Sequence, residues 1–146
     1  MDRMIFINLP VTDLDRSIAF YEAVGAVKDE RFCDASAAMV KFSEAINVML
    51  LTHARFAGFT DRPIADRSTT EVLLCLSAES RDHCDALVNT AVGAGGRADP
   101  CHPQDYGFMY GRSFEDPDGH IWELAWMDME AAMKASTSPA PEAVAA

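Results

Sequence analysis

The chain has 146 residues, of which 49% are hydrophobic, and a formal net charge of -11 with an isoelectric point near 4.6. This length and apolar fraction suit one globular domain with its own core. The acidic balance argues against nucleic acid and anionic membranes as partners, because both attract basic surfaces. No apolar run is long enough to cross a bilayer.

The first residues and the spacing of the cysteines allow a prediction of the cellular compartment. The opening stretch lacks the charge and apolar order of a signal peptide, which predicts a cytoplasmic protein. The four cysteines are widely spaced and form no Cys-x-x-Cys pair. In a reducing compartment they are expected as free thiols rather than as disulfides or zinc ligands.

The first half of the chain predicts a strand, a helix and three further strands. Thr12 or Asp13 can cap the helix, and Gly25 can end it. A charged segment with Gly and Pro at 54–68 is predicted to be a surface connector. By residue range, the predicted elements are a strand at 5–9, a helix with apolar positions from 14 to 24, and strands at 27–33, 37–42 and 46–52.

The same order then restarts in the second half. The predicted elements are a strand at 71–77, a helix that Ser80 or Asp82 caps and Gly95-Gly96 ends, strands at 97–101, 108–115 and 120–126, a final helix at 127–134 and a disordered tail at 135–146. The repetition predicts two βαβββ modules, at about 4–53 and 69–127, within one domain that spans 1–134. Each module alone leaves a sheet face uncovered, so we expect the two sheets to close around a shared cleft.

The stretch from Phe114 to Leu124 predicts a hairpin that carries a functional carboxylate. Pro117 and Gly119 favour a tight turn between its strands. In the second strand, alternation places Glu123 on one face and His120 on the other. A carboxylate among apolar neighbours must be paired, protonated or bound to a cation. Glu123 is therefore the candidate catalytic base or metal ligand.

Two motifs resemble the vicinal-oxygen-chelate superfamily of glyoxalase I, extradiol dioxygenases, fosfomycin-resistance enzymes and bleomycin-resistance proteins. They are LPVTDLDRSIAFY at 9–21 and EDPDGHIWEL at 115–124, and the resemblance covers about residues 4–127. The chain is particularly similar to bacterial members labelled as predicted lactoylglutathione lyases. The resemblance implies an α+β fold in which paired βαβββ modules form a curved sheet around a cleft. It also implies a small-molecule ligand and a homodimer.

In metal-dependent members of the superfamily, the first and last strands of each module aim His and Glu ligands into the cleft. The matching positions here are Phe6, Val48, Glu71 and Glu123, so Glu71 and Glu123 are the candidate metal ligands. The resemblance implies a divalent Zn, Ni, Mn or Fe ion. Two of the four positions are apolar and none is His, whereas such ions prefer three or four protein ligands. We therefore expect that no metal is bound tightly.

Candidate substrate-binding residues come from segment 104–112, in which aromatic residues alternate with glycine. Tyr106, Phe108 and Tyr110 are candidates to line the cleft, and Arg112 can pair with a substrate carboxylate. Core packing and a structural ion pair are the competing interpretations. The apolar positions Phe6 and Val48 would complete the lining.

Three functions are compatible with this pattern. The first is a glyoxalase-like lyase or isomerase that acts on a small carbonyl compound, with Glu123 as base or ligand. The second is a metal-free protein that sequesters a small molecule, as bleomycin-resistance members do. The third is an interaction module with a vestigial cleft.

Overall fold

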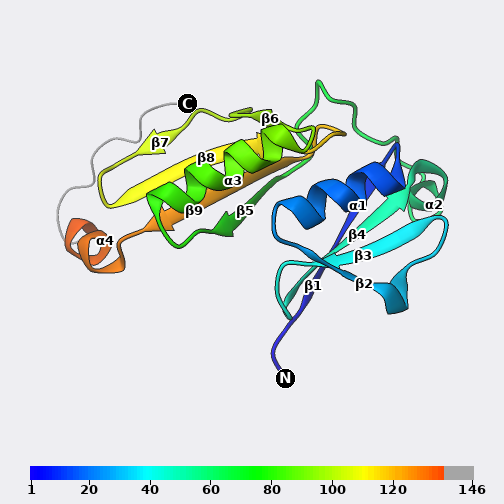
Figure 1. Ribbon diagram of the computed structural model, residues 1–146, viewed down its shortest axis with the longest axis horizontal. Helices are drawn as coiled ribbons and strands as arrows, with labels where there is room; N and C mark the ends of the chain where they lie inside the picture. Colours follow the sequence, from blue (N-terminus) through cyan, green and yellow to red (C-terminus); the bar gives the residue numbers. More distant parts are fainter. Residues whose placement is uncertain (137–146) are drawn as a thin grey trace.

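A computed structural model of the chain describes residues 1–136 and arranges them as two βαβββ modules (Figure 1). The first contains β1 (Ile5–Val11), α1 (Leu14–Ala23), β2 (Val27–Asp29), a 3-10 turn (Glu30–Phe32), β3 (Ala37–Lys41) and β4 (Ile46–Thr52), followed by the short helix α2 (His53–Ala57). The second contains β5 (Leu73–Ser77), α3 (Arg81–Gly93), β6 (Arg97–Ala98), β8 (Met109–Glu115) and β9 (Ile121–Met127), followed by α4 (Met129–Ser136). The two-residue strand β7 (Gln104–Asp105) is an addition to the βαβββ pattern. The predicted α+β fold of paired modules is confirmed.

Each module forms its own mixed sheet. Sheet A has the order β1-β4-β3-β2, and sheet B has the order β5-β9-β8-β6 with β7 also paired to β8. In both sheets the first strand of the module runs parallel to the last, and the remaining pairs are antiparallel. The strands β1 and β5 therefore stand at equivalent edges of the two sheets.

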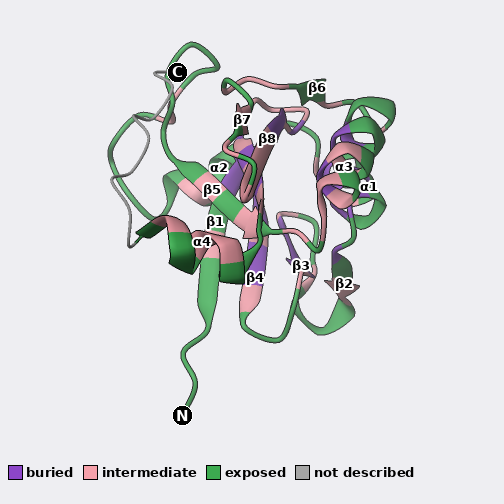
Figure 2. Cartoon of the chain, turned by 90° about the vertical axis from the view of Figure 1, so that its left-hand side faces the viewer, coloured by how far each residue is buried: buried purple, intermediate pink, exposed green. Residues whose placement is uncertain are grey.

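Helices α1 and α3 lie on the same side of the molecule, each over one face of its own sheet (Figures 1 and 2). The side chain of Asp13 caps α1 by accepting from the Arg16 amide, and Ser80 caps α3 by accepting from the His83 amide. The helices and the sheet faces beneath them share one core that spans both modules. Its largest fully buried side chains include Val11, Phe20, Tyr21, Val40, Val48, Leu50, Val88, Phe114, Trp122 and Leu124.

The observed elements differ from the predicted ones at several places, including β1, which extends to Val11, and β6, which ends at Ala98. Strand β2 ends at Asp29, because the Asp29 carboxylate accepts from the Arg31 amide and starts the 3-10 turn. Strand β5 begins at Leu73, two residues later than predicted. Helix α4 extends to Ser136, and the rest of the predicted tail, 137–146, lies outside the described residues. Within residues 1–136, no helix is long and apolar enough to span a membrane.

Candidate functional site

A buried polar network joins the two modules through the hairpin turn of the second. The Tyr21 hydroxyl on α1 donates to Asp116 at 2.7 Å, and the indole N–H of Trp122 donates to the same hydroxyl oxygen at 3.0 Å. Burial, the negative charge of Asp116 and their hydrogen bond raise the pKa of Tyr21 well above its ordinary value. This tyrosine therefore stays neutral and acts as a structural link.

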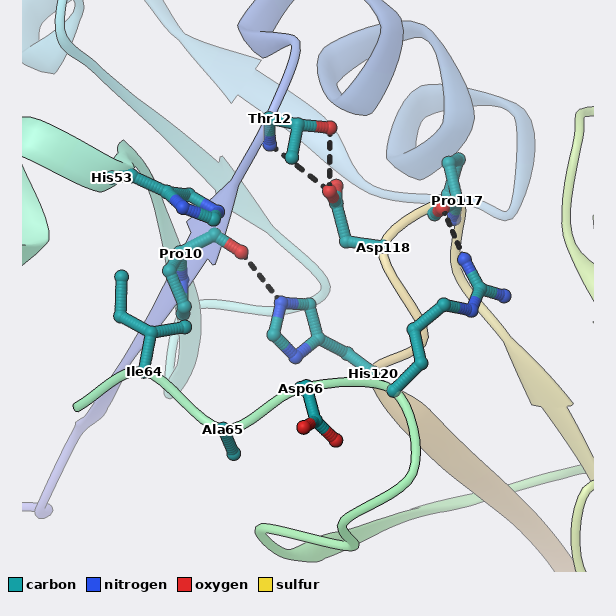
Figure 3. Close-up of a pocket in the computed structure, with 10 residues that line it drawn as sticks. Pro10, Thr12, His53, Ile64, Ala65, Asp66, Pro117, Asp118 and His120 are labelled. Atoms are coloured by element: carbon teal, nitrogen blue, oxygen red, sulfur yellow. Dashed lines mark hydrogen bonds between the residues drawn. The ribbon is translucent and has the colours of Figure 1, made fainter.

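His120 connects the same turn to the first module, through Pro10 (Figure 3), and to the segment before β5, through Glu71. Its Nε2 lies 2.7 Å from the Pro10 carbonyl oxygen, and its Nδ1 contacts the Glu71 carboxylate. Burial alone would lower the pKa of His120, but the hydrogen bond to Glu71, the charge of Asp116 and the Pro10 carbonyl raise it to about 9. The ring is therefore a buried imidazolium, a role that strand alternation did not reveal.

A hollow of about 260 Å³ lies beside this junction, between segment 64–67 and the turn at 117–120 (Figure 3). Asp118 accepts from the amide and the hydroxyl of Thr12 at 3.0 and 2.8 Å. Arg67 donates to the Pro117 carbonyl at 2.8 Å and to Glu115 at 2.7 Å. These groups are already paired with one another, so the hollow belongs to the bridge between the modules.

Glu71 and Glu123 do not converge. Glu71 precedes β5 and contacts His120, whereas Glu123 lies in β9 directly opposite Cys75 of β5. Glu71 is four positions before Cys75, which corresponds to roughly 13 Å along the strand direction. The predicted pair of metal ligands is therefore not formed in this structure, because Glu71 is the carboxylate partner of a buried histidine.

Glu123 lies on the face of sheet B that α3 leaves open. It is half-buried, and its strand neighbours on either side are Cys75 and Ser113. A hollow of about 200 Å³ on this face includes Glu123 and both Cys75 and Cys101. Partial desolvation and the charge of Glu123 raise the pKa of both thiols, so they remain protonated at neutral pH. All four cysteines of the chain are free thiols.

The placement predicted for Val48 is wrong by one residue. Its side chain is fully buried on the α1 side of sheet A, as that of Trp122 is on the α3 side of sheet B. The neighbour that faces the open side, as Glu123 does, is therefore Met49. The error arises because the turn before β4 is shorter than the turn before β9, so that counting from the turn misplaces the register.

The spacing to the helix caps identifies the residue of the second module that is equivalent to Phe6. Phe6 lies seven residues before the helix cap Asp13, and Leu73 lies seven residues before the helix cap Ser80. The open-face positions on the outer strands of the modules are thus Phe6, Met49, Leu73 and Glu123. Phe6 and Leu73 are about half exposed, at 51% and 46%.

These four positions do not fit a transition-metal centre. Only Glu123 offers a ligand atom of the usual kind, because phenylalanine and leucine have none and a thioether is a weak one. Within residues 1–136, no three side chains of His, Cys, Asp or Glu are grouped so that they could hold a metal ion. The donor set therefore gives no basis for metal chemistry at this site.

Two predicted substrate-binding residues lie on the helix side of sheet B instead of the open side. The Tyr110 hydroxyl donates to Asp85 of α3 at 2.7 Å. Arg112 donates to Asp85 at 3.0 Å and to Asp99 at 3.1 and 2.7 Å. Because side chains alternate along β8, Tyr110 and Arg112 lie on the same face of the sheet. Their partners are on α3 and in the loop after β6. For Arg112, these contacts support the interpretation as a structural ion pair.

The other two aromatic candidates remain accessible. Tyr106 and Phe108 stack with ring centroids 6.3 Å apart in the loop between β7 and β8, and both are half-buried. Their role in ligand binding stays a prediction, as does that of Phe6. Phe6 borders a hollow of about 560 Å³ on the open face of sheet A, which sequence reasoning did not identify; its lining residues include Phe32, Met39, Asn47 and Met49.

The paired modules, each with its own mixed sheet and helix, define the fold class, and comparison with known proteins gives the family. Residues 3–124 match the model of the Glyoxalase/Bleomycin resistance protein/Dioxygenase superfamily. The chain belongs to this superfamily. A search of curated proteins found no match.

Solved structures agree with this assignment. Hypothetical protein SA1046 from S. aureus is 25% identical, with a TM-score of 0.72 over 86% of this chain and 94% of that one. A superfamily enzyme from Burkholderia phytofirmans PsJN is 17% identical, with a TM-score of 0.70 over 86% and 99% of the two chains. TnmS3, an antibiotic binding protein from Streptomyces sp. CB03234, is 18% identical, with a TM-score of 0.61 over 87% and 97%.

Proposed function

We propose that this protein binds a small molecule without a metal ion, with Glu123 as the polar group that selects the ligand. The observation that carries the proposal is the state of Glu123. This half-buried carboxylate borders a hollow, and it has no hydrogen-bond or ion-pair partner among residues 1–136. Such a carboxylate is stabilised by a ligand that brings a hydrogen-bond donor or a positive charge.

The comparisons are compatible with this reading. The similar structures include an antibiotic binding protein and FosX fosfomycin resistance proteins, at 16–18% identity. At such identity they share the fold, which presents open sheet faces, and their ligands are not transferred to this chain. The net charge of -11 favours cationic ligands at the open face of sheet B.

A screen of small molecules against the unchanged protein and Glu123→Gln tests the proposal. Binders should raise the thermal midpoint of unfolding and should shift NMR signals of Cys75, Ser113 and Ala125. Their affinity should fall about 10-fold or more in Glu123→Gln, which corresponds to about 1.4 kcal/mol. The exposed Glu22→Gln, on α1, should bind them unchanged. A screen in which no compound perturbs the Glu123 face would overturn the proposal.

A second candidate is a lyase or isomerase that acts on a small carbonyl compound, with Glu123 as general base. The same unpaired carboxylate on an open face favours it. Methylglyoxal is a suitable first probe, because its adjacent carbonyl groups represent the substrate class. Turnover detected by NMR and lost in Glu123→Gln would favour the enzyme, whereas binding without turnover would favour sequestration.

We also propose that two copies assemble so that the open faces form closed clefts. Strands β1 and β5 are sheet edges, and Ile5, Phe6, Val72 and Leu73 along them are 44–52% exposed. Exposed apolar edges of this kind favour pairing with another strand. Light scattering should give about twice the chain mass of 16.0 kDa, and Leu73→Lys should shift the protein to monomer. A monomer at all accessible concentrations would contradict this assembly.

A further inference from the structure

We propose that the hollow on the open face of sheet A binds a flat apolar ring that carries one neutral N–H or O–H group, and that Asn47 Oδ1 accepts the hydrogen bond from this group. The inference goes beyond the proposed function, because it assigns a second binding site with a ligand class of its own. It concerns the first module, whereas Glu123 belongs to the second.

Asn47 carries the inference because half of its amide is unsatisfied. The side chain is fully buried, with 0% exposure. Its Nδ2 donates to the Ile5 carbonyl oxygen at 3.1 Å, which fixes the orientation of the amide. Oδ1 is then left without a hydrogen-bond partner among the described residues. A buried acceptor without a partner destabilises the protein, and a ligand donor would remove this cost.

The surroundings of Asn47 suit an aromatic ring. Phe6 of β1 lies beside Asn47 in the sheet, and Phe32 of the 3-10 turn lies across the same hollow. Met39 and Met49 also line it. Thioether sulfurs and aromatic rings pack well against a flat ring. The volume of about 560 Å³ lies within the range of small-molecule sites.

The charges at the rim favour a neutral donor. Arg31 and Lys41 both border the hollow, and they pair with Asp29 and Glu44 at 2.8 and 3.7 Å. Lys41 lies directly opposite Asn47 in the strand pairing. A ligand cation at Asn47 would face this ammonium group at close range. A phenol or an indole supplies the donor without that repulsion.

The ligand must displace a side chain to reach the acceptor. Asn47 Oδ1 has no exposed surface, although the residue lines the hollow. Met39 and Met49, which are paired in neighbouring strands on this face, are the flexible residues able to rotate. Binding should therefore change the environment of these two methionine methyl groups, which makes them reporters for the site.

Indole and N-methylindole form the test pair, because they share a ring system and only indole donates. NMR spectra of protein with ¹³C-labelled methionine methyls should show that indole shifts Met39 and Met49. Indole should bind about 10-fold more tightly than N-methylindole. In Asn47→Leu this preference should fall below about 2-fold. Asn8→Leu, which removes an exposed amide from the same sheet face, should retain it.

Each other outcome overturns the inference. Equal binding of the two probes to the unchanged protein would show a merely apolar patch, and this comparison does not depend on whether Asn47→Leu folds. Shifts confined to Met109, which lines the hollow beside Glu123, would refute the inference and leave the proposed function standing. A complete lack of shifts would also refute the inference, whereas the proposed function is tested by its own screen against Glu123→Gln. Loss of self-association in Asn47→Leu would assign the acceptor to an interface between copies.

Discussion

His120 and Glu71 form an ion pair at the junction of the two modules, with the histidine side chain 8% exposed and the glutamate side chain 28% exposed. The same imidazole lies 2.7 Å from the Pro10 carbonyl oxygen of β1. One side chain from the hairpin turn thus connects β1 of the first module with the segment before β5 of the second. The family motif at 115–124 therefore also supplies the histidine that joins the two modules of this chain.

This ion pair makes stability depend on pH. The folded-state pKa of His120 is raised from 6.5 to about 9. The stabilisation is therefore fully present below about pH 6.5 and is lost as the pH rises toward 9. The raised pKa corresponds to a loss on the order of 3 kcal/mol. Urea unfolding should show this fall across the window in the unchanged protein and a much flatter profile in His120→Gln. Parallel profiles in the two proteins would contradict the prediction.

Removal of the Tyr21 hydroxyl should destabilise the junction without leaving a cavity. Tyr21→Phe leaves the carboxylate of Asp116 and the indole N–H of Trp122 without their shared partner. We expect the free energy of unfolding to fall by about 2–3 kcal/mol. Tyr106→Phe is the matched control, because that hydroxyl makes no hydrogen bond within the described residues, and it should change stability by less than about 0.5 kcal/mol. Equal effects of the two substitutions would refute the prediction.

Arg112 should matter for stability and not for ligand binding. Arg112→Leu leaves Asp85 and Asp99 without their partly buried cation. Denaturant unfolding should show a loss of about 1–3 kcal/mol. Arg112 also borders the hollow beside Glu123, but its guanidinium is held by Asp85 and Asp99 on the α3 side of sheet B, so ligands that depend on Glu123 should bind with unchanged affinity. The exposed Arg62→Leu is the control for stability, and a selective loss of ligand affinity in Arg112→Leu would restore the substrate-binding assignment.

Ligand atoms placed at the three apolar open-face positions should create a metal site. The combination Phe6→His, Met49→Glu and Leu73→His supplies the residue types that metal-dependent relatives use, beside Glu123. If two copies close the cleft, calorimetry should find that the triple variant binds about one Zn²⁺ or Ni²⁺ per chain. Adding Glu123→Gln to this variant should lower its affinity for the ion. The unchanged protein should bind less than one ion. Failure of the triple variant to bind metal would show that the open faces do not meet.

Strand and helix order followed from local pattern, and so the fold could be predicted. Apolar periodicity, the caps Asp13 and Ser80, and the turn residues Pro117 and Gly119 act within a few residues of one another. Alternation also placed Glu123 on the face opposite Trp122 correctly, since both lie in one strand. Predictions from such local patterns agree with the structure because they do not depend on which distant segments contact one another.

The sequence by itself therefore determined the duplicated βαβββ architecture and the orientation of Glu123 in its strand. Only the tertiary structure decided which side chains are paired. It assigned Glu71 to His120 and Arg112 to Asp85 and Asp99. Among residues 1–136, it left Glu123 and Asn47 Oδ1 without a hydrogen-bond or ion-pair partner. The reason is physical: pairing depends on distances across strands and modules, and a one-residue difference in turn length, as before β4, reverses the face that a side chain occupies.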